Sequence, residues 1–133
     1  MIAKTLRSCK VFTAGDKSML REILNPRQER LKTRYSLAWA RVKARHKTIP
    51  HRLRYSEVYY ILKGTGEIHV NRRRRKVKTN DTIYIPPNAV QWIGNTGRTS
   101  LDFLCIVDPA WEMKCETVMF SPSPLSPPLK GGE

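Results

Sequence analysis

The chain has 133 residues, a length that suits one domain with its own hydrophobic core rather than two. Hydrophobic residues make up 40% of it, but no apolar run approaches the ~18 residues that a membrane-spanning helix requires. Lysine and arginine total 25 against 11 acidic residues, for a formal net charge of +14. We therefore expect no membrane-spanning segment and a surface that attracts polyanions.

The basic residues are dense in one place, between Arg72 and Lys78. This cluster follows Val70 and Asn71, where the pattern predicts the turn of a hairpin. Because a basic hairpin is usually a solvated one, we expect salt-sensitive, nonspecific electrostatic binding of nucleic acid and no specific nucleic-acid partner.

The three cysteines and the first residues of the chain bear on its compartment. The N-terminus has no apolar run of the length that a signal peptide needs. Cys9, Cys105 and Cys115 form no C-x-x-C pair, and Cys105 lies in an apolar run that predicts a buried thiol. We therefore expect a cytoplasmic protein with reduced cysteines and without a structural zinc site.

Residues 1–33 are predicted to form an N-terminal arm with a short helix. Asp16 is a candidate N-cap, because apolar residues at helical spacing follow it. These residues are Met19, Leu20, Ile23 and Leu24. Pro26 ends the predicted helix, since the residue before a proline is pushed out of the helical region.

Residues 34–118 are predicted to form an all-β domain. Segment 36–43 alternates in the manner of a strand, with Leu37, Trp39 and Arg41 on one face and small or apolar residues on the other. Further strands are expected at residues 52–63, 67–71, 75–78, 82–85, 90–94 and 101–107. Short strands separated by Gly, Asn and Pro are typical of a sandwich or barrel.

Residues 119–133 are predicted to form a disordered tail. Four of the nine prolines lie between Ser121 and Glu133, with few apolar residues among them. Such a composition does not supply enough apolar surface to order the chain.

The stretch between Thr48 and Gly66 is the most informative part of the sequence. His51 and Glu57 share parity along an extended segment, so we expect both side chains on one face of a strand. An aromatic and β-branched run follows, and Gly64 and Gly66 turn the chain back. A histidine and a carboxylate on one face predict a metal or small-molecule pocket inside a β-barrel.

Residues 45–95 resemble the two motifs of small single-domain cupins. The first motif, G-x5-H-x-H-x3-E-x6-G, corresponds in spacing to Arg45, His51, Leu53, Glu57 and Gly64. The second, G-x5-P-x-G-x2-H-x3-N, corresponds to Asn80, Pro86, Asn88, Gln91 and Asn95. With the flanking strands the resemblance extends over residues 34–110. It implies an antiparallel jelly-roll β-barrel.

The resemblance also implies an incomplete metal-ligand set. Cupins typically hold a divalent metal through two histidines and the glutamate of the first motif and the histidine of the second. This chain keeps His51 and Glu57, but it has Leu53 and Gln91 at the other two positions. Leucine cannot ligate, whereas glutamine offers a neutral oxygen. The implied ligands are therefore His51, Glu57 and Gln91, and the implied metals are Mn, Fe, Ni or Zn.

Two interpretations of this site stay open. In one, His51, Glu57 and Gln91 hold a metal with open positions, which His46 or His69 could complete. In the other, the pocket has no metal and the three side chains hydrogen-bond one another. The expected pocket-lining residues are Leu53, Tyr59, Ile61, Trp39, Ile93 and Phe103. An unligated Glu57 would have a raised pKa and would suit acid–base catalysis.

Two classes of function follow, and the residues do not decide whether the protein is an enzyme. The first is a cupin-barrel protein whose central pocket binds a divalent metal, a small polar ligand, or both. The second is a metal-dependent enzyme of isomerase, epimerase or dioxygenase type that acts on a small sugar or oxygenated acid. The resemblance also implies a homodimer, for which segment 36–43 is a candidate shared edge.

Overall fold

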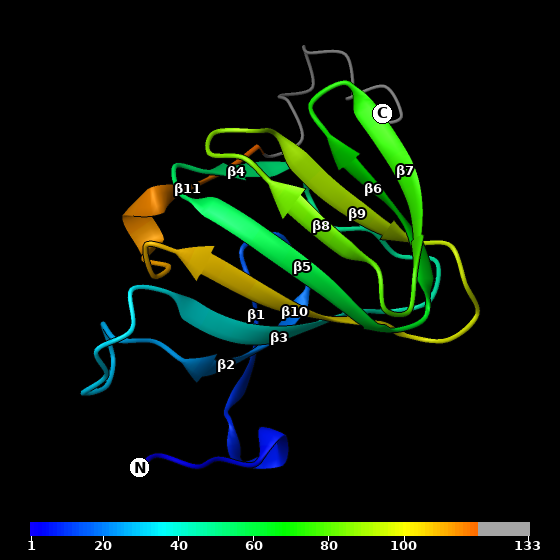
Figure 1. Ribbon diagram of the computed structural model, residues 1–133. Helices are drawn as coiled ribbons and strands as arrows, with labels where there is room; N and C mark the ends of the chain where they lie inside the picture. The colour runs from blue at the N-terminus through cyan, green and yellow to red at the C-terminus, as the bar shows by residue number, and fades with distance from the viewer. Residues whose placement is uncertain (120–133) are drawn as a thin grey trace.

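The computed structural model describes residues 1–119, so nearly all of the predicted C-terminal tail lies outside the described residues. The chain forms two antiparallel sheets that face each other (Figure 1). In chain order the strands are β1 (Val11–Thr13), β2 (Met19–Leu24), β3 (Ser36–Val42), β4 (His51–Leu53), β5 (Ser56–Lys63), β6 (Thr65–Val70), β7 (Arg73–Lys78), β8 (Thr82–Ile85), β9 (Gln91–Asn95), β10 (Leu101–Asp108) and β11 (Glu116–Val118).

The topology of the two sheets confirms the predicted all-β jelly-roll architecture. One sheet has six strands in the order β1-β2-β3-β10-β5-β8, and the other has five in the order β11-β4-β9-β6-β7. From β3 to β11 the chain passes from one sheet to the other at every step except between β6 and β7. The described strands divide into these two sheets rather than one continuous closed ladder.

The hydrophobic core lies between the sheets. Its most buried members come from strands of both sheets, and each is at most 1% exposed: Ile61, Ile85, Ile93, Leu101 and Phe103. The period of two along each strand directs these side chains inward and their neighbours outward. Tyr59 and Tyr60 show this alternation, because Tyr59 is buried and Tyr60 is exposed and donates to Asn80 Oδ1.

The predicted helix after Asp16 is wrong, because Met19–Leu24 is strand β2. This strand pairs with β3 on one side and with β1 on the other. Four apolar residues within six positions fit a helical period, but they fit a half-buried strand as well. The backbone hydrogen bonds that β3 offers decide the outcome. In the arm, a short 3-10 turn, η1 (Leu6–Ser8), stands in place of the predicted helix.

Asp16 stabilises the turn between β1 and β2 instead of capping a helix. Its Oδ1 atom accepts hydrogen bonds from the backbone nitrogen of Ser18 at 3.0 Å and from Ser18 Oγ at 2.6 Å. Lys17, between them, has a positive φ of 76°. This is the local side-chain capping that favours aspartate in turns. The turn carries the Asp16 carboxylate to the space between the sheets.

The single strand predicted for 52–63 is divided into β4 and β5, which belong to different sheets. His51 and Glu57 therefore do not share one strand, as predicted from their parity. Both side chains point into the space between the sheets, His51 from one sheet and Glu57 from the other. Segment 36–43, the candidate edge to be shared between two copies, lies inside the sheet, because β3 pairs with β2 and with β10.

Neither of the helical turns within residues 1–119, η1 and η2 (Met113–Cys115), approaches the length and hydropathy of a membrane-spanning helix. The three cysteines are free thiols, and all three are buried.

Two glycines lie side by side where β6 pairs with β9, and only one of them has space for a side chain. A Cβ atom on Gly66 would lie 2.5 Å from the carbonyl oxygen of Gly94 and 2.8 Å from Leu101 Cδ2. A Cβ atom on Gly94 would make only ordinary contacts, the nearest at 3.6 Å to Trp92. Backbone therefore approaches Gly66 closely on the inner face of the sheet.

We expect Gly66→Ala to lower the free energy of unfolding by about 1–3 kcal/mol, because the new methyl group overpacks a buried site against backbone. Gly94→Ala is the matched control and should change it by much less. Urea denaturation of both variants measures the difference. Equal effects of the two substitutions would contradict this packing of β6 against β9.

Candidate functional site

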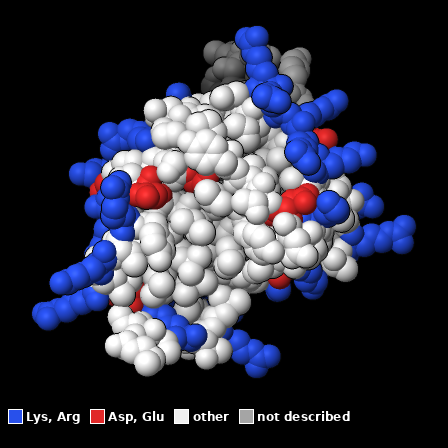
Figure 2. All heavy atoms as spheres, viewed as in Figure 1, with Lys and Arg blue, Asp and Glu red and all other residues white. Residues whose placement is uncertain are grey.

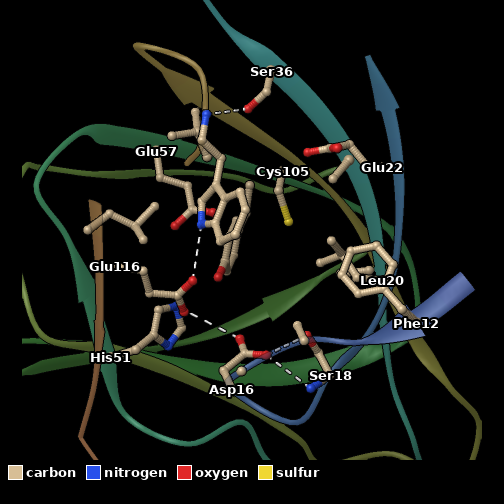
Figure 3. Close-up of a pocket in the computed structure, with 18 of the residues that line it drawn as sticks. Phe12, Asp16, Ser18, Leu20, Glu22, Ser36, His51, Glu57, Cys105 and Glu116 are labelled. Atoms are coloured by element: carbon tan, nitrogen blue, oxygen red, sulfur yellow. Dashed lines mark hydrogen bonds and ion pairs between the residues drawn. The ribbon is translucent and has the colours of Figure 1, made fainter. Parts of the chain in front are cut away.

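A cavity of about 340 Å³ opens between the two sheets (Figure 3). Its volume lies within the range of small-molecule sites. The inward positions of β3 make room for it, because they carry the small side chains of Ser36, Ala38 and Ala40. A strand with large residues at these positions would fill the same space.

Four polar side chains from four different elements point into this cavity (Figure 3). Asp16 comes from the β1–β2 turn, His51 from β4, Glu57 from β5 and Glu116 from β11. A further carboxylate, that of Glu22 on β2, lies on the opposite wall. The lining within residues 1–119 includes no lysine or arginine.

Glu57 is held in a hydrogen-bonded chain with Gln91 and Tyr59. Gln91 Nε2 donates to Glu57 Oε1 at 2.9 Å, and Tyr59 Oη donates to Gln91 Oε1 at 2.9 Å. All three residues are buried, with exposed fractions of 6% or less. The amide of Gln91 is therefore engaged at both its nitrogen and its oxygen. This chain satisfies groups that would otherwise be costly to bury.

His51 presents a ring nitrogen with a free lone pair to the cavity. Its Nδ1 atom lies 3.0 Å from the carbonyl oxygen of Ile49, so Nδ1 carries the proton and donates. Nε2 is then the acceptor nitrogen in the neutral ring. It lies 3.8 Å from Asp16 Oδ2, which is too far for a hydrogen bond.

Burial raises the pKa of Glu57 from 4.5 to about 7. The hydrogen bond from Gln91 opposes this shift, as does His51 when its ring is protonated, whereas the charges of Asp16 and Glu116 add to it. Burial also raises the pKa of Glu116. The cavity therefore holds a carboxyl group that exchanges its proton near neutral pH.

The side chains present do not fit the metal centre that the resemblance implies. His51 and Glu57 face the cavity, but the Gln91 amide is engaged with its neighbours, and Leu53 packs against Val107 and Cys115. Within residues 1–119 no group of three or more His, Cys, Asp or Glu side chains is arranged to hold a metal ion.

The two histidines considered as further ligands lie outside the cavity. His46 is exposed and bonds through Nδ1 to the carbonyl oxygen of Ala44. The ring of His69 stacks on Trp92 with centroids 3.6 Å apart, and its Nε2 contacts Glu67. Neither of them completes a ligand set with His51.

The structure brings half of the predicted pocket-lining residues to the cavity. Leu53, Tyr59 and Phe103 line it, whereas Ile61 and Ile93 belong to the hydrophobic core and are not part of the lining. Trp39 lies on the opposite face of β3 from Ala38 and Ala40. There the guanidinium groups of Arg21 and Arg41 cover its ring.

The sequence did not indicate three acidic residues of the cavity, Asp16, Glu22 and Glu116. All three lie outside residues 45–95, where the motifs are, and come from the β1–β2 turn, β2 and β11. Trp111 fixes Glu116, because its Nε1 atom donates to Glu116 Oε1 at 3.0 Å. The backbone nitrogen of Trp111 in turn donates to Ser36 Oγ at 2.9 Å.

The raised pKa of Glu57 predicts how stability depends on pH. Between about pH 4.5 and 7 the folded chain keeps a proton on Glu57 that the unfolded chain has released, so raising the pH favours unfolding. From this group we expect a loss of about 3 kcal/mol across that window, at 1.36 kcal/mol per pKa unit. Glu57→Gln removes the titration and keeps an oxygen for Gln91 Nε2.

Urea denaturation at several pH values measures this effect as the difference between wild type and variant. We expect the two stability curves to diverge as the pH rises through this window, with the variant gaining relative to wild type. Parallel curves would show that Glu57 titrates at its ordinary pKa.

The cupin domain family matches this chain over residues 38–107. An uncharacterised protein of Methanocaldococcus jannaschii (MJ1618) is 38% identical over 103 residues, which cover 77% of this chain and 82% of that protein. The oxalate-binding protein of Thermotoga maritima is 37% identical over 51 residues, or 38% of this chain and 42% of that protein.

Among solved structures, the polyketide cyclase RemF of Streptomyces resistomycificus superposes with a TM-score of 0.75. The two are 17% identical, and the match covers 90% of this chain and 86% of that chain. This likeness concerns the fold alone. Since the family match spans more than half of the sequence and agrees with the strand topology, the chain belongs to the cupin domain family.

Proposed function

We propose that this cupin binds a small polar ligand in the cavity between its sheets and that binding does not depend on a divalent metal. The observation that supports this most strongly is the series of hydrogen bonds from Tyr59 through Gln91 to Glu57, which occupies the Gln91 amide at both its nitrogen and its oxygen. A metal held by Glu57 and Gln91 together would have to displace the Tyr59 hydroxyl from the Gln91 oxygen. The cavity meanwhile keeps about 340 Å³ of space.

The name of the Thermotoga maritima relative raises oxalate as a candidate ligand, but the lining of this cavity argues against it. A dicarboxylate needs positive charge or several donors, and four carboxylates line the cavity without a lysine or arginine among the described lining residues. The match to that relative also covers less than half of either protein. The ligand of this chain therefore differs in charge from oxalate.

A second candidate function is acid–base catalysis of isomerase or epimerase type, with Glu57 as the proton carrier. The observation in its favour is the pKa of about 7, because a group that titrates near neutral pH both accepts and donates a proton readily. Glu57 faces the same space as the ligand. In this case Glu57→Gln would abolish turnover.

We also propose that the protein pairs into a homodimer. β1 is the outer strand of the six-stranded sheet, and its residues Val11 and Phe12 are each 43% exposed. An exposed edge strand offers unpaired backbone groups to a second copy. The basic residues Arg73 to Lys76 of β7 are exposed, and for them we keep the expectation of nonspecific electrostatic binding.

Elemental analysis of protein purified without a histidine tag tests the metal-independent part of the proposal. We expect far less than one Mn, Fe, Ni or Zn per chain and no change of melting temperature when a mild chelator is added. One metal per chain that disappears in both His51→Ala and Glu57→Gln would contradict the proposal.

A thermal-shift screen of small polar compounds tests the cavity itself. Compounds that raise the melting temperature of wild type should lose this effect in Ala38→Phe, because the larger ring occupies the cavity that Ala38 lines. Thr117→Phe, at an exposed position of β11 outside the lining, is the matched control and should keep it. Stabilisation that persists in Ala38→Phe would place binding elsewhere.

A further inference from the structure

Three carboxylates of the cavity share one hydrogen-bonding arrangement. In each, one oxygen accepts from a protein donor that fixes the side chain: Ser18 for Asp16, Gln91 for Glu57 and Trp111 for Glu116. The second oxygen of each accepts no hydrogen bond from any described residue. The protein therefore orients these groups and leaves an acceptor of each available.

His51 adds a fourth acceptor by a separate route. Its exposed fraction is 3%, and Nδ1 is bound to the Ile49 carbonyl oxygen. Nε2 faces the cavity and lies 3.8 Å from Asp16 Oδ2, the contact drawn as a dashed line in Figure 3, which is longer than a hydrogen bond. A buried ring nitrogen in this state lacks a donor, which a ligand in the cavity would supply.

The charge of the cavity is opposite to that of the molecule. The chain carries a formal net charge of +14, and Figure 2 shows lysine and arginine side chains projecting from the edges of the molecule around a broad area without them. The cavity lining, by contrast, has four carboxylates and no lysine or arginine among the described residues. If charged residues were distributed at random on so basic a chain, the lining would contain more lysine and arginine than aspartate and glutamate.

Aromatic rings form much of the remaining wall. Phe12, Tyr59, Phe103 and Trp111 line the cavity. The faces of such rings attract cations, an interaction that strengthens when water is excluded. Rings and carboxylates together suit an organic cation with an apolar part, whereas a bare metal ion would leave most of the cavity empty.

We propose that the cavity binds a small organic cation whose charged group donates several hydrogen bonds, namely a protonated amine or a guanidinium. This inference rests on the proposed ligand-binding function and names the class of ligand. The cationic group would lie among Asp16, Glu57 and Glu116 and would donate to their free oxygens and to His51 Nε2. Its alkyl part would contact the aromatic wall.

Isothermal titration calorimetry with small probes that differ in charge tests the class of ligand. The probes are n-butylguanidinium and n-butylammonium as cations, butyramide as the neutral compound, and n-butyrate and oxalate as anions, at one fixed salt concentration. We expect millimolar or tighter binding of the cations only, and the stronger of the two cations identifies the group that the site prefers. The positive surface repels cations, so their binding is not a surface effect.

Isosteric variants locate the bound cation. Asp16→Asn and Glu116→Gln keep the oxygens that accept from Ser18 and Trp111, and each should weaken cation binding by about tenfold or more. Glu67→Gln removes a carboxylate outside the cavity and should leave affinity unchanged. Melting temperatures of the three variants confirm that each is folded.

The outcomes separate this inference from the proposed function. Cation binding that is lost in Asp16→Asn, Glu116→Gln and Ala38→Phe supports the inference. If only neutral or anionic probes bind, and their binding is lost in Ala38→Phe, the ligand is not a cation. The proposed ligand-binding function is then still supported. Cation binding that is equally strong in Asp16→Asn, Glu116→Gln and wild type, or no cation binding at millimolar concentration, also overturns the inference.

Discussion

The arrangement of the interior depends on how the buried carboxylate of Glu57 is held. Glu57 belongs to the six-stranded sheet and Gln91 to the five-stranded sheet, so the hydrogen bond between them crosses the interior. Tyr59 completes the link by donating to the Gln91 oxygen. These two hydrogen bonds use both polar atoms of the Gln91 amide and fix the relative position of the sheets, and the second Glu57 oxygen faces the cavity.

This link explains how the cupin interior remains intact without the usual histidines. A glutamine at position 91 supplies both a donor and an acceptor, which a metal-bound imidazole does not offer to its neighbours. Leu53, at the other changed position, packs with Val107 and Cys115. The small inward residues of β3 then keep a cavity open beside the network, and the carboxylates that line it give that cavity a charge opposite to the surface.

The sequence predicted the fold well, because motif spacing and strand alternation are local properties. It predicted the site only in part. Met19–Leu24 is a strand because it forms backbone hydrogen bonds with β3. Its short apolar pattern does not indicate that pairing. Asp16 and Glu116 reach the cavity through tertiary contacts far from the motifs. For Trp39, alternation defined two faces of β3, but it did not show which of them would be covered by the other sheet.

The most direct test of the central claim is a carbon-13 NMR titration of the Glu57 side-chain carboxyl, assigned by comparison with Glu57→Gln. We expect a midpoint near pH 7 and no change of that midpoint after chelation, since burial and the Gln91 hydrogen bond set it rather than a metal. A midpoint near the ordinary 4.5, or one that a chelator moves, would contradict the account of the cavity given above.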